Sequence, residues 1–212
     1  MTGSRVRWWA PGRTGWWIAA LFVVGSACFA LGALPAYVDL VGPQAAGVTF
    51  FVGSLFFTSA AALQVRDLGA SSDRATRAAG LVQLAGTLLF NVSTFEALQQ
   101  GLTAPEADRT VWTPDVWGSL AFLAASGLAF AVVPRPWLRW RPRNRAWALA
   151  AANLVGSIAF GVSAVASRVV LSTDTLRDAE RANLGTFIGA LCFLVGAMLL
   201  IPRSPRIGEV NR

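Results

Sequence analysis

Charged residues divide the chain into six long stretches that contain no Asp, Glu, Lys or Arg. Each stretch is 18 to 26 residues long, and together they cover 14–38, 40–65, 78–95, 116–134, 146–167 and 182–202. A helix rises about 1.5 Å per residue and needs about 20 residues to cross a hydrocarbon core of about 30 Å. The stretches lack the alternation of membrane β-strands, which are about ten residues long. The pattern predicts an all-α integral membrane protein with six transmembrane helices.

Composition agrees with a membrane protein and disfavours a nucleic-acid-binding one. Hydrophobic residues make up 55% of the 212 residues and charged residues only 14%, whereas soluble domains average about 25% charged residues. The formal net charge of +7 comes from 18 Arg with no Lys. These Arg are not interleaved with base-stacking aromatic residues on one element, as nucleic-acid binding would require. We therefore expect no nucleic-acid partner.

The Arg residues indicate which ends of the helices face the cytoplasm. Fourteen of them lie before the first stretch, in the second and fourth loops or after the last stretch, and only four lie in the other loops. The positive-inside rule then predicts that both termini are cytoplasmic. All nine Trp lie near predicted helix ends, where amphipathic rings prefer the headgroup region. We expect a multi-pass protein of the bacterial cytoplasmic (inner) membrane, with membrane lipids as partners.

One short motif occurs in all six stretches. It consists of Gly, then Ser, Thr or Ala, two variable residues, Phe, and a small residue seven positions after the Gly. The copies begin at Gly25, Gly53, Gly86, Gly118, Gly156 and Gly189, and their Phe residues are Phe29, Phe57, Phe90, Phe122, Phe160 and Phe193. Spacings of four and seven share one helical face. Because helices in lipid associate where small residues let them approach, we interpret the motif as a packing feature.

The motif also predicts a larger repeat within a single transmembrane domain that spans residues 1–212. Successive helices form three parallel two-helix hairpin repeats, at about 14–66, 78–135 and 146–203. Parallel repeats imply pseudo-rotation about the membrane normal. The Gly-Ser-x-x-Phe helix, short turn and Gly-Ser-Leu-x-Phe helix resemble the two-helix YrhK-like membrane domain, repeated three times. The whole chain resembles uncharacterised actinobacterial six-helix membrane proteins, and the resemblance implies no activity and no catalytic residues.

The residue types present exclude much familiar chemistry. Without His or Lys, the chain lacks a His-ligated haem, a His-containing zinc site, a Ser/His/Asp triad and a Schiff-base lysine. We predict no catalytic, cofactor-binding or metal site. Cys28 and Cys192 occupy the same motif position in the first and last helices, which places them for a disulfide or a metal pair if those helices meet. We interpret both as packing residues.

Polar residues inside the spans are the candidate site. Gln83, Asn91 and Asn153 are the deepest strong hydrogen-bonding groups; they form either a polar core between the third and fifth helices or a ligand contact. Glu96 and Arg168 lie near the outer ends of those helices and are a candidate outer ion pair. The mixed charges of 174–181 predict a short surface helix.

Three hypotheses for function follow. The first is a non-enzymatic membrane interaction or lipid-associated bundle. The alternative is a transporter or channel for a small neutral solute, with Gln83, Asn91 and Asn153 as its lining. The second alternative is a membrane enzyme that uses outer carboxylates, which would be Glu96, Asp108, Asp115 or Asp174. The ligand and any self-association into a homo-oligomer stay open.

Overall fold

The computed structural model describes residues 9–69, 72–133, 143–170 and 175–201, and these are predominantly helical. The long helices are α1 (Thr14–Gly32), α3 (Pro43–Asp67), α4 (Arg74–Glu96), α6 (Thr113–Ala131), α7 (Arg145–Ala166) and α8 (Ala179–Leu200). The short elements are α2 (Pro35–Val41), α5 (Ala104–Ala107), the π-helical η1 (Asp108–Trp112), β1 (Val169–Val170) and β2 (Thr175–Leu176). Six helices are long and apolar enough to cross a membrane, with Ala104–Ala131 counted as one. This confirms the six predicted spans and indicates a multi-pass membrane protein.

Proline determines where the first span ends. The residue before a proline is disfavoured in the α conformation, and Leu34 is extended, with φ −83° and ψ 119°. The helix therefore stops at Gly32 although the uncharged stretch continues to Val38. Proline begins the next two helices as well, because its missing N–H and fixed φ suit the first helical turn. Gly42, at φ 85°, provides the turn between them.

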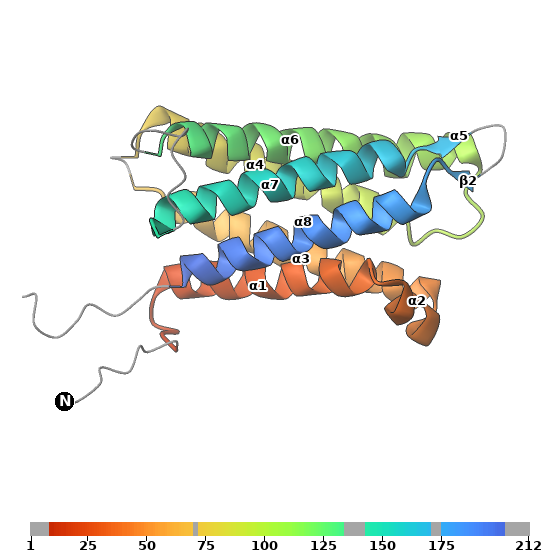
Figure 1. Ribbon diagram of the computed structural model, residues 1–212, viewed down its shortest axis with the longest axis horizontal. Helices are drawn as coiled ribbons and strands as arrows, with labels where there is room; N and C mark the ends of the chain where they lie inside the picture. The colour runs from red at the N-terminus through yellow and green to blue at the C-terminus, as the bar shows by residue number, and fades with distance from the viewer. Residues whose placement is uncertain (1–8, 70–71, 134–142, 171–174, 202–212) are drawn as a thin grey trace, which may run out of the picture.

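The six long helices form a closed ring. Each packs against the next in the order α1, α3, α4, α6, α7, α8, and α8 packs against α1. In Figure 1, α1 begins and α8 ends at the same end of the bundle, which we call the base. The opposite end, which we call the crown, carries α2, α5 and the β1–β2 hairpin. The most extensive contacts join α1 to α3, α4 to α6, and α7 to α8.

The predicted surface helix at 174–181 is wrong. Val169 and Val170 pair antiparallel with Leu176 and Thr175 as a short β-hairpin. The next residues begin α8, whose first turn is capped by the Asp178 carboxylate accepting from the Arg181 N–H. The mixed charges at helical spacing therefore belong partly to a strand and partly to the start of the last span. Asp174 lies outside the described residues.

The outward and inward faces of the helices differ in the way that a lipid environment favours. A large apolar side chain near the middle of every long helix is 41% to 51% exposed, namely Val24, Leu55, Leu88, Leu120, Ile158 and Val195. Such exposure is free of cost against lipid but not against water. The interior instead contains Ala, Ser and Gly together with the six motif Phe residues, which are only 4% to 8% exposed.

The motif glycines are points of close approach within the three most extensive helix pairs. A Cβ at Gly53 would lie 2.7 Å from Cys28 Cβ, and a Cβ at Gly25 would lie 3.0 Å from the Gly53 carbonyl oxygen. A Cβ at Gly189 would lie 2.5 Å from Phe160 Cδ2. These distances leave no room for a methyl group without movement. Each helix of a pair thus presents a small residue to the partner's ring or backbone, as the packing interpretation predicted.

Candidate functional site

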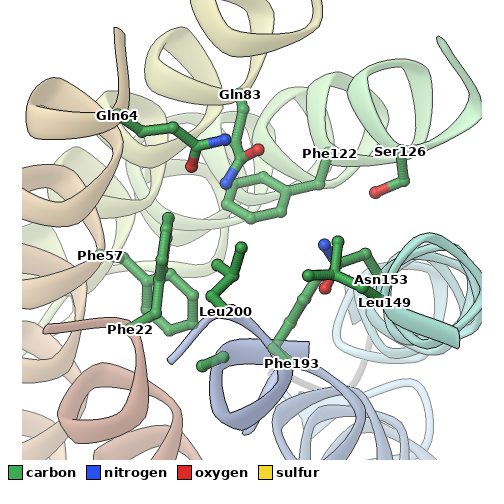
Figure 2. Close-up of a pocket in the computed structure, with 11 residues that line it drawn as sticks. Phe22, Phe57, Gln64, Gln83, Phe122, Ser126, Leu149, Asn153, Phe193 and Leu200 are labelled. Atoms are coloured by element: carbon green, nitrogen blue, oxygen red, sulfur yellow. The ribbon is translucent and has the colours of Figure 1, made fainter. Parts of the chain in front are cut away.

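A cavity of about 50 Å³ lies on the axis of the ring, near the base. Figure 2 shows Gln64 and Gln83 pointing toward one another at one edge of the cavity, with Asn153 across from them. Phe57, Phe122 and Phe193 line it as well. The other lining residues are Phe22, Ser126, Leu149, Ala197 and Leu200. Three amide side chains from α3, α4 and α7 therefore converge on one small space.

Helical spacing explains why these amides face the axis. Gln83 and Asn153 each precede a motif Phe by seven residues, and Gln64 follows Phe57 by seven. Seven residues are close to two helical turns, so each amide lies on the same face as its Phe. The Phe rings are buried at the centre, and the amides consequently occupy the same axis nearer the base.

The amides of this cavity retain free hydrogen-bonding capacity. Among the described residues, Gln64, Gln83 and Asn153 form no hydrogen bond to another protein group, although each amide has two donors and an acceptor. Asn153 Oδ1 lies directly against Gly196 of α8, where a Cβ would collide with it. The last small residue of the sixth motif copy thus makes room for an amide that faces the cavity. Such groups are available to a polar ligand.

Asn91 does not belong to this site. It follows Phe90 directly and is therefore rotated by about 100° from the axis-facing side of α4. It is not among the cavity residues, and its Oδ1 is buried without a hydrogen-bond partner. The third and fifth predicted helices are α4 and α7, and α6 packs between them in the ring. Of the three predicted residues, the structure brings together Gln83 and Asn153.

Two residues of the site were missed by the sequence analysis. Gln64 lies two residues before Arg66, near the end of its span, and was not singled out. Its seven-residue spacing from Phe57 was the available signal. Ser126 follows Phe122 by four residues, and its hydroxyl lies 2.7 Å from the Ser157 hydroxyl. This buried hydrogen bond joins α6 to α7 beside the cavity.

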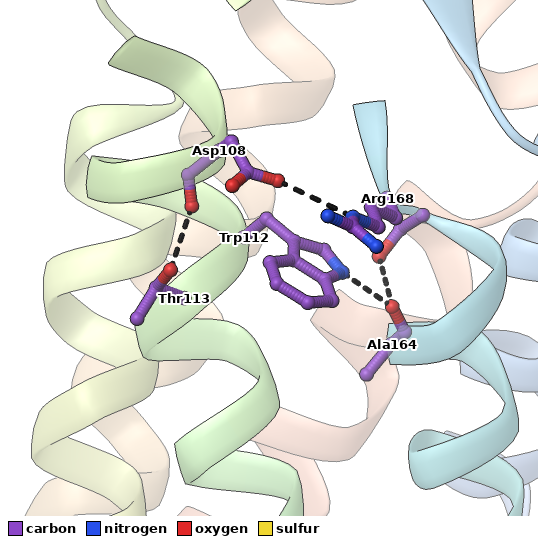
Figure 3. Close-up of polar contacts among 6 residues, drawn as sticks. Asp108, Trp112, Thr113, Ala164 and Arg168 are labelled. Atoms are coloured by element: carbon purple, nitrogen blue, oxygen red, sulfur yellow. Dashed lines mark hydrogen bonds and ion pairs between the residues drawn. The ribbon is translucent and has the colours of Figure 1, made fainter. Parts of the chain in front are cut away.

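A second polar cluster lies at the crown, as Figure 3 shows. Trp112 Nε1 donates to the Ala164 carbonyl oxygen at 2.7 Å, and the Arg168 guanidinium lies 5.2 Å from the centre of the Trp112 ring. Arg168 Nε is 3.7 Å from Asp108 Oδ1. The Thr113 hydroxyl donates to the Asp108 carbonyl oxygen across the π-helical turn. These contacts fasten η1 to the end of α7.

The predicted pairing of Glu96 with Arg168 is not what the structure contains. Arg168 pairs with Asp108, and Glu96 instead accepts a hydrogen bond from Gln99 Nε2. The ring order explains the difference, since α6 rather than α4 packs against α7, and the turn η1 that precedes α6 is bonded to α7 through Trp112. Arg168 has a side chain that is 57% exposed, and an ion pair of this exposure contributes at most about 1 kcal/mol.

The remaining candidate groups are dispersed. Cys28 and Cys192 are both free thiols; Cys28 packs at Gly53 of α3 and Cys192 at Gly156 of α7. In the part of the chain that the structure describes, no three His, Cys, Asp or Glu side chains are grouped as a metal site would require. Asp115 lies in the first turn of α6 and is partly buried.

Comparisons of the chain with protein-family models, with curated proteins and with solved structures gave no match.

Proposed function

We propose that this multi-pass membrane protein binds a small uncharged polar solute in its axial cavity and passes it across the membrane. The observation that carries the proposal is the convergence of Gln64, Gln83 and Asn153 from three helices on one small cavity. Polar groups inside a membrane are expensive unless they have a partner. Three amides without a protein partner are therefore better explained by a ligand than by packing.

The cavity limits the size and charge of the solute. One water molecule needs about 10 to 15 Å³ of such volume, so about 50 Å³ accommodates a solute of about three to five non-hydrogen atoms. The cavity lining contains no ionisable side chain, which disfavours an ion because nothing offsets its desolvation. Amides donate and accept hydrogen bonds equally. Formamide and urea are solutes with this chemistry and of this size.

The charge distribution supports a cytoplasmic base, with both termini on that side. Within the described residues, the base carries six Arg and two acidic residues, and the crown carries four Arg and seven acidic residues. An excess of Arg marks cytoplasmic loops. The arginine-rich stretch 134–142, which contributed to this prediction, lies outside the described residues. We propose on this basis that the axial cavity is loaded from the cytoplasmic face of a bacterial inner membrane.

We also propose that the ring is built from three copies of one two-helix unit, of the YrhK-like type that the motif resembles. The similar contacts at Gly25 and Gly53, at Gly86 and Gly118, and at Gly156 and Gly189 support this repeat. The first helix of each copy places the residue seven positions before its motif Phe on the cavity wall. Those positions hold Phe22, Gln83 and Asn153, so the copies differ where a ligand would bind.

The test is solute flux into proteoliposomes, followed by light scattering after osmotic challenge with formamide, urea or glycerol. We expect faster entry of the smaller solutes than in empty liposomes, and loss of this entry in Asn153→Leu. The matched control is Asn91→Leu, which removes an amide outside the cavity and should leave entry unchanged. Entry at the rate of empty liposomes for every solute, or equal loss in both variants, would contradict the proposal. That result would favour the hypothesis of a non-enzymatic, lipid-associated bundle.

A further inference from the structure

The six motif Phe rings form a regular cluster on the axis, which we call the phenylalanine prism. Phe57, Phe122 and Phe193 contact one another as one triangle, with ring centres 5.5 to 6.3 Å apart. A second triangle has ring centres 5.9 to 6.3 Å apart and consists of Phe29, Phe90 and Phe160. Every helix of the ring contributes one Phe. The axis is therefore occupied by aromatic rings from all sides.

Contacts between the triangles complete the prism. In each of the three most extensively packed helix pairs, the two motif Phe residues belong to different triangles. Their rings contact each other, with ring centres 5.3 to 5.6 Å apart. Separations in this range are the favoured ones for aromatic pairs. The two triangles are thus stacked along the axis, and each ring contacts three others.

The prism separates the axial cavity from the crown. Phe57, Phe122 and Phe193 line the amide-lined cavity and also a second, smaller hole of about 10 Å³. All six prism rings line that hole, together with Ser54. The Ser54 hydroxyl donates to the Phe51 carbonyl oxygen and also lies 3.0 Å from the Thr94 hydroxyl. About 10 Å³ is at the lower limit for one water molecule, and apolar cavities of this kind stay dry.

We propose that the phenylalanine prism is a two-layer apolar gate, so that water and small solutes cross the axis only when both triangles open. Hydrophobic constrictions close pathways by excluding water. The triangle with Phe57 closes the amide-lined cavity, and the triangle with Phe29 closes the axis behind it. The gate rests on the proposed solute function, because it assigns the position at which that solute is held back.

The test compares breaches of one layer with a breach of both. Phe29→Ala and Phe57→Ala each open one triangle, and the double variant opens both on neighbouring helices. We measure osmotic water permeability of proteoliposomes by stopped-flow light scattering after sucrose addition. Because water needs a continuous path, we expect each single variant to stay near the wild type and the double variant to rise by about tenfold or more.

The chain offers a matched control for the loss of two rings. Phe51 of α3 and Phe95 of α4 contact each other with ring centres 5.5 Å apart, and they line neither the axial cavity nor the hole inside the prism. The double variant Phe51→Ala/Phe95→Ala should stay near wild-type permeability. If Phe29→Ala/Phe57→Ala does not give a monodisperse helical protein, the equivalent pair Phe90→Ala/Phe122→Ala is used in its place.

The outcomes separate the gate from the proposed function. A folded double variant without increased water permeability would overturn the gate, as would a single variant or the control that leaks as much as the double. Water permeability does not depend on solute recognition by Asn153. A leaking double variant in a protein without solute flux would therefore keep the gate and reject the proposed solute. Solute flux in the wild type together with a double variant that does not leak water would keep the proposed solute function and reject the gate.

Discussion

The glycine at position 189 gives a stability prediction with a built-in control. A Cβ there would lie 2.5 Å from Phe160 Cδ2 and 3.0 Å from the Gly156 carbonyl oxygen. Ordinary contact begins at 3.4 Å, so the overlap with the ring is 3.4 minus 2.5, or 0.9 Å. Phe160 cannot withdraw freely, because it packs against other rings of the prism. The helices must move apart or the ring must leave its rotamer.

Overpacking of this kind costs about 1 to 3 kcal/mol. Replacing Gly by Ala within a helix offsets about 0.5 to 1 kcal/mol of that through lower backbone entropy. We expect Gly189→Ala to lower the free energy of unfolding by up to about 2.5 kcal/mol. Gly161→Ala, on the neighbouring helix, has no atom within 4 Å of the new Cβ. It should be neutral or stabilising by up to about 1 kcal/mol.

The assay is reversible unfolding in mixed micelles with increasing SDS, followed by circular dichroism and Trp fluorescence. We expect the free energies of unfolding of the two variants to differ by about 1 to 3 kcal/mol. This difference measures the cost of overpacking at Gly189, since both variants gain the same helix propensity. If Gly189→Ala and Gly161→Ala unfold at the same SDS fraction, the close approach of α7 and α8 is not as described.

Three further predictions follow from individual contacts. Ser126→Ala and Ser157→Ala should show a coupling of about 0.6 to 1.7 kcal/mol in a double-mutant cycle of unfolding, because each removes one side of the buried bond between α6 and α7. Arg145→Gln should lower stability by about 1.5 to 3 kcal/mol, because the guanidinium donates to the Leu199 and Ile201 carbonyl oxygens at the end of α8; equal loss in the exposed Arg143→Gln would refute this. Hydrogen bonds from the Thr76 hydroxyl and N–H lower the pKa of Asp73 below its ordinary value of 3.8, so its helix cap stabilises the fold above that pH and is lost as the pH falls through the folded pKa. The difference in thermal stability between the wild type and Asp73→Ala should therefore be present at pH 7 and shrink below pH 3.8, and a difference independent of pH would contradict it.

The sequence was sufficient for the spans and for the axis-facing side of each helix. Uncharged length identifies a helix that can cross a membrane, and the spacing of Gly25 and Phe29, repeated six times, identifies the packed face. The end of the first span was missed by six residues because hydropathy does not register the backbone restriction before Pro35. At Thr175 the chain pairs with Val170 as a short strand, where charge spacing favoured a helix.

The sequence pattern does not predict which helices pack against each other. Helical periodicity says which residues share a face but not which helix lies opposite. In the ring, α6 lies between α4 and α7. The third and fifth helices therefore do not pack directly against each other, and Arg168 pairs with Asp108 instead of Glu96. Asn91 lies deep in its span, but its angle on the helix turns it away from the axis. The same angular rule would have selected Gln64, seven residues from Phe57.

The most direct test of the proposed solute site is an experimental structure in lipid nanodiscs at a resolution that shows ordered small molecules. We predict a closed ring of six helices with non-protein density between the amides of Gln83 and Asn153, bounded by Phe57, Phe122 and Phe193. A structure in which those amides bond directly to one another or to the helices, with no space between them, would contradict it.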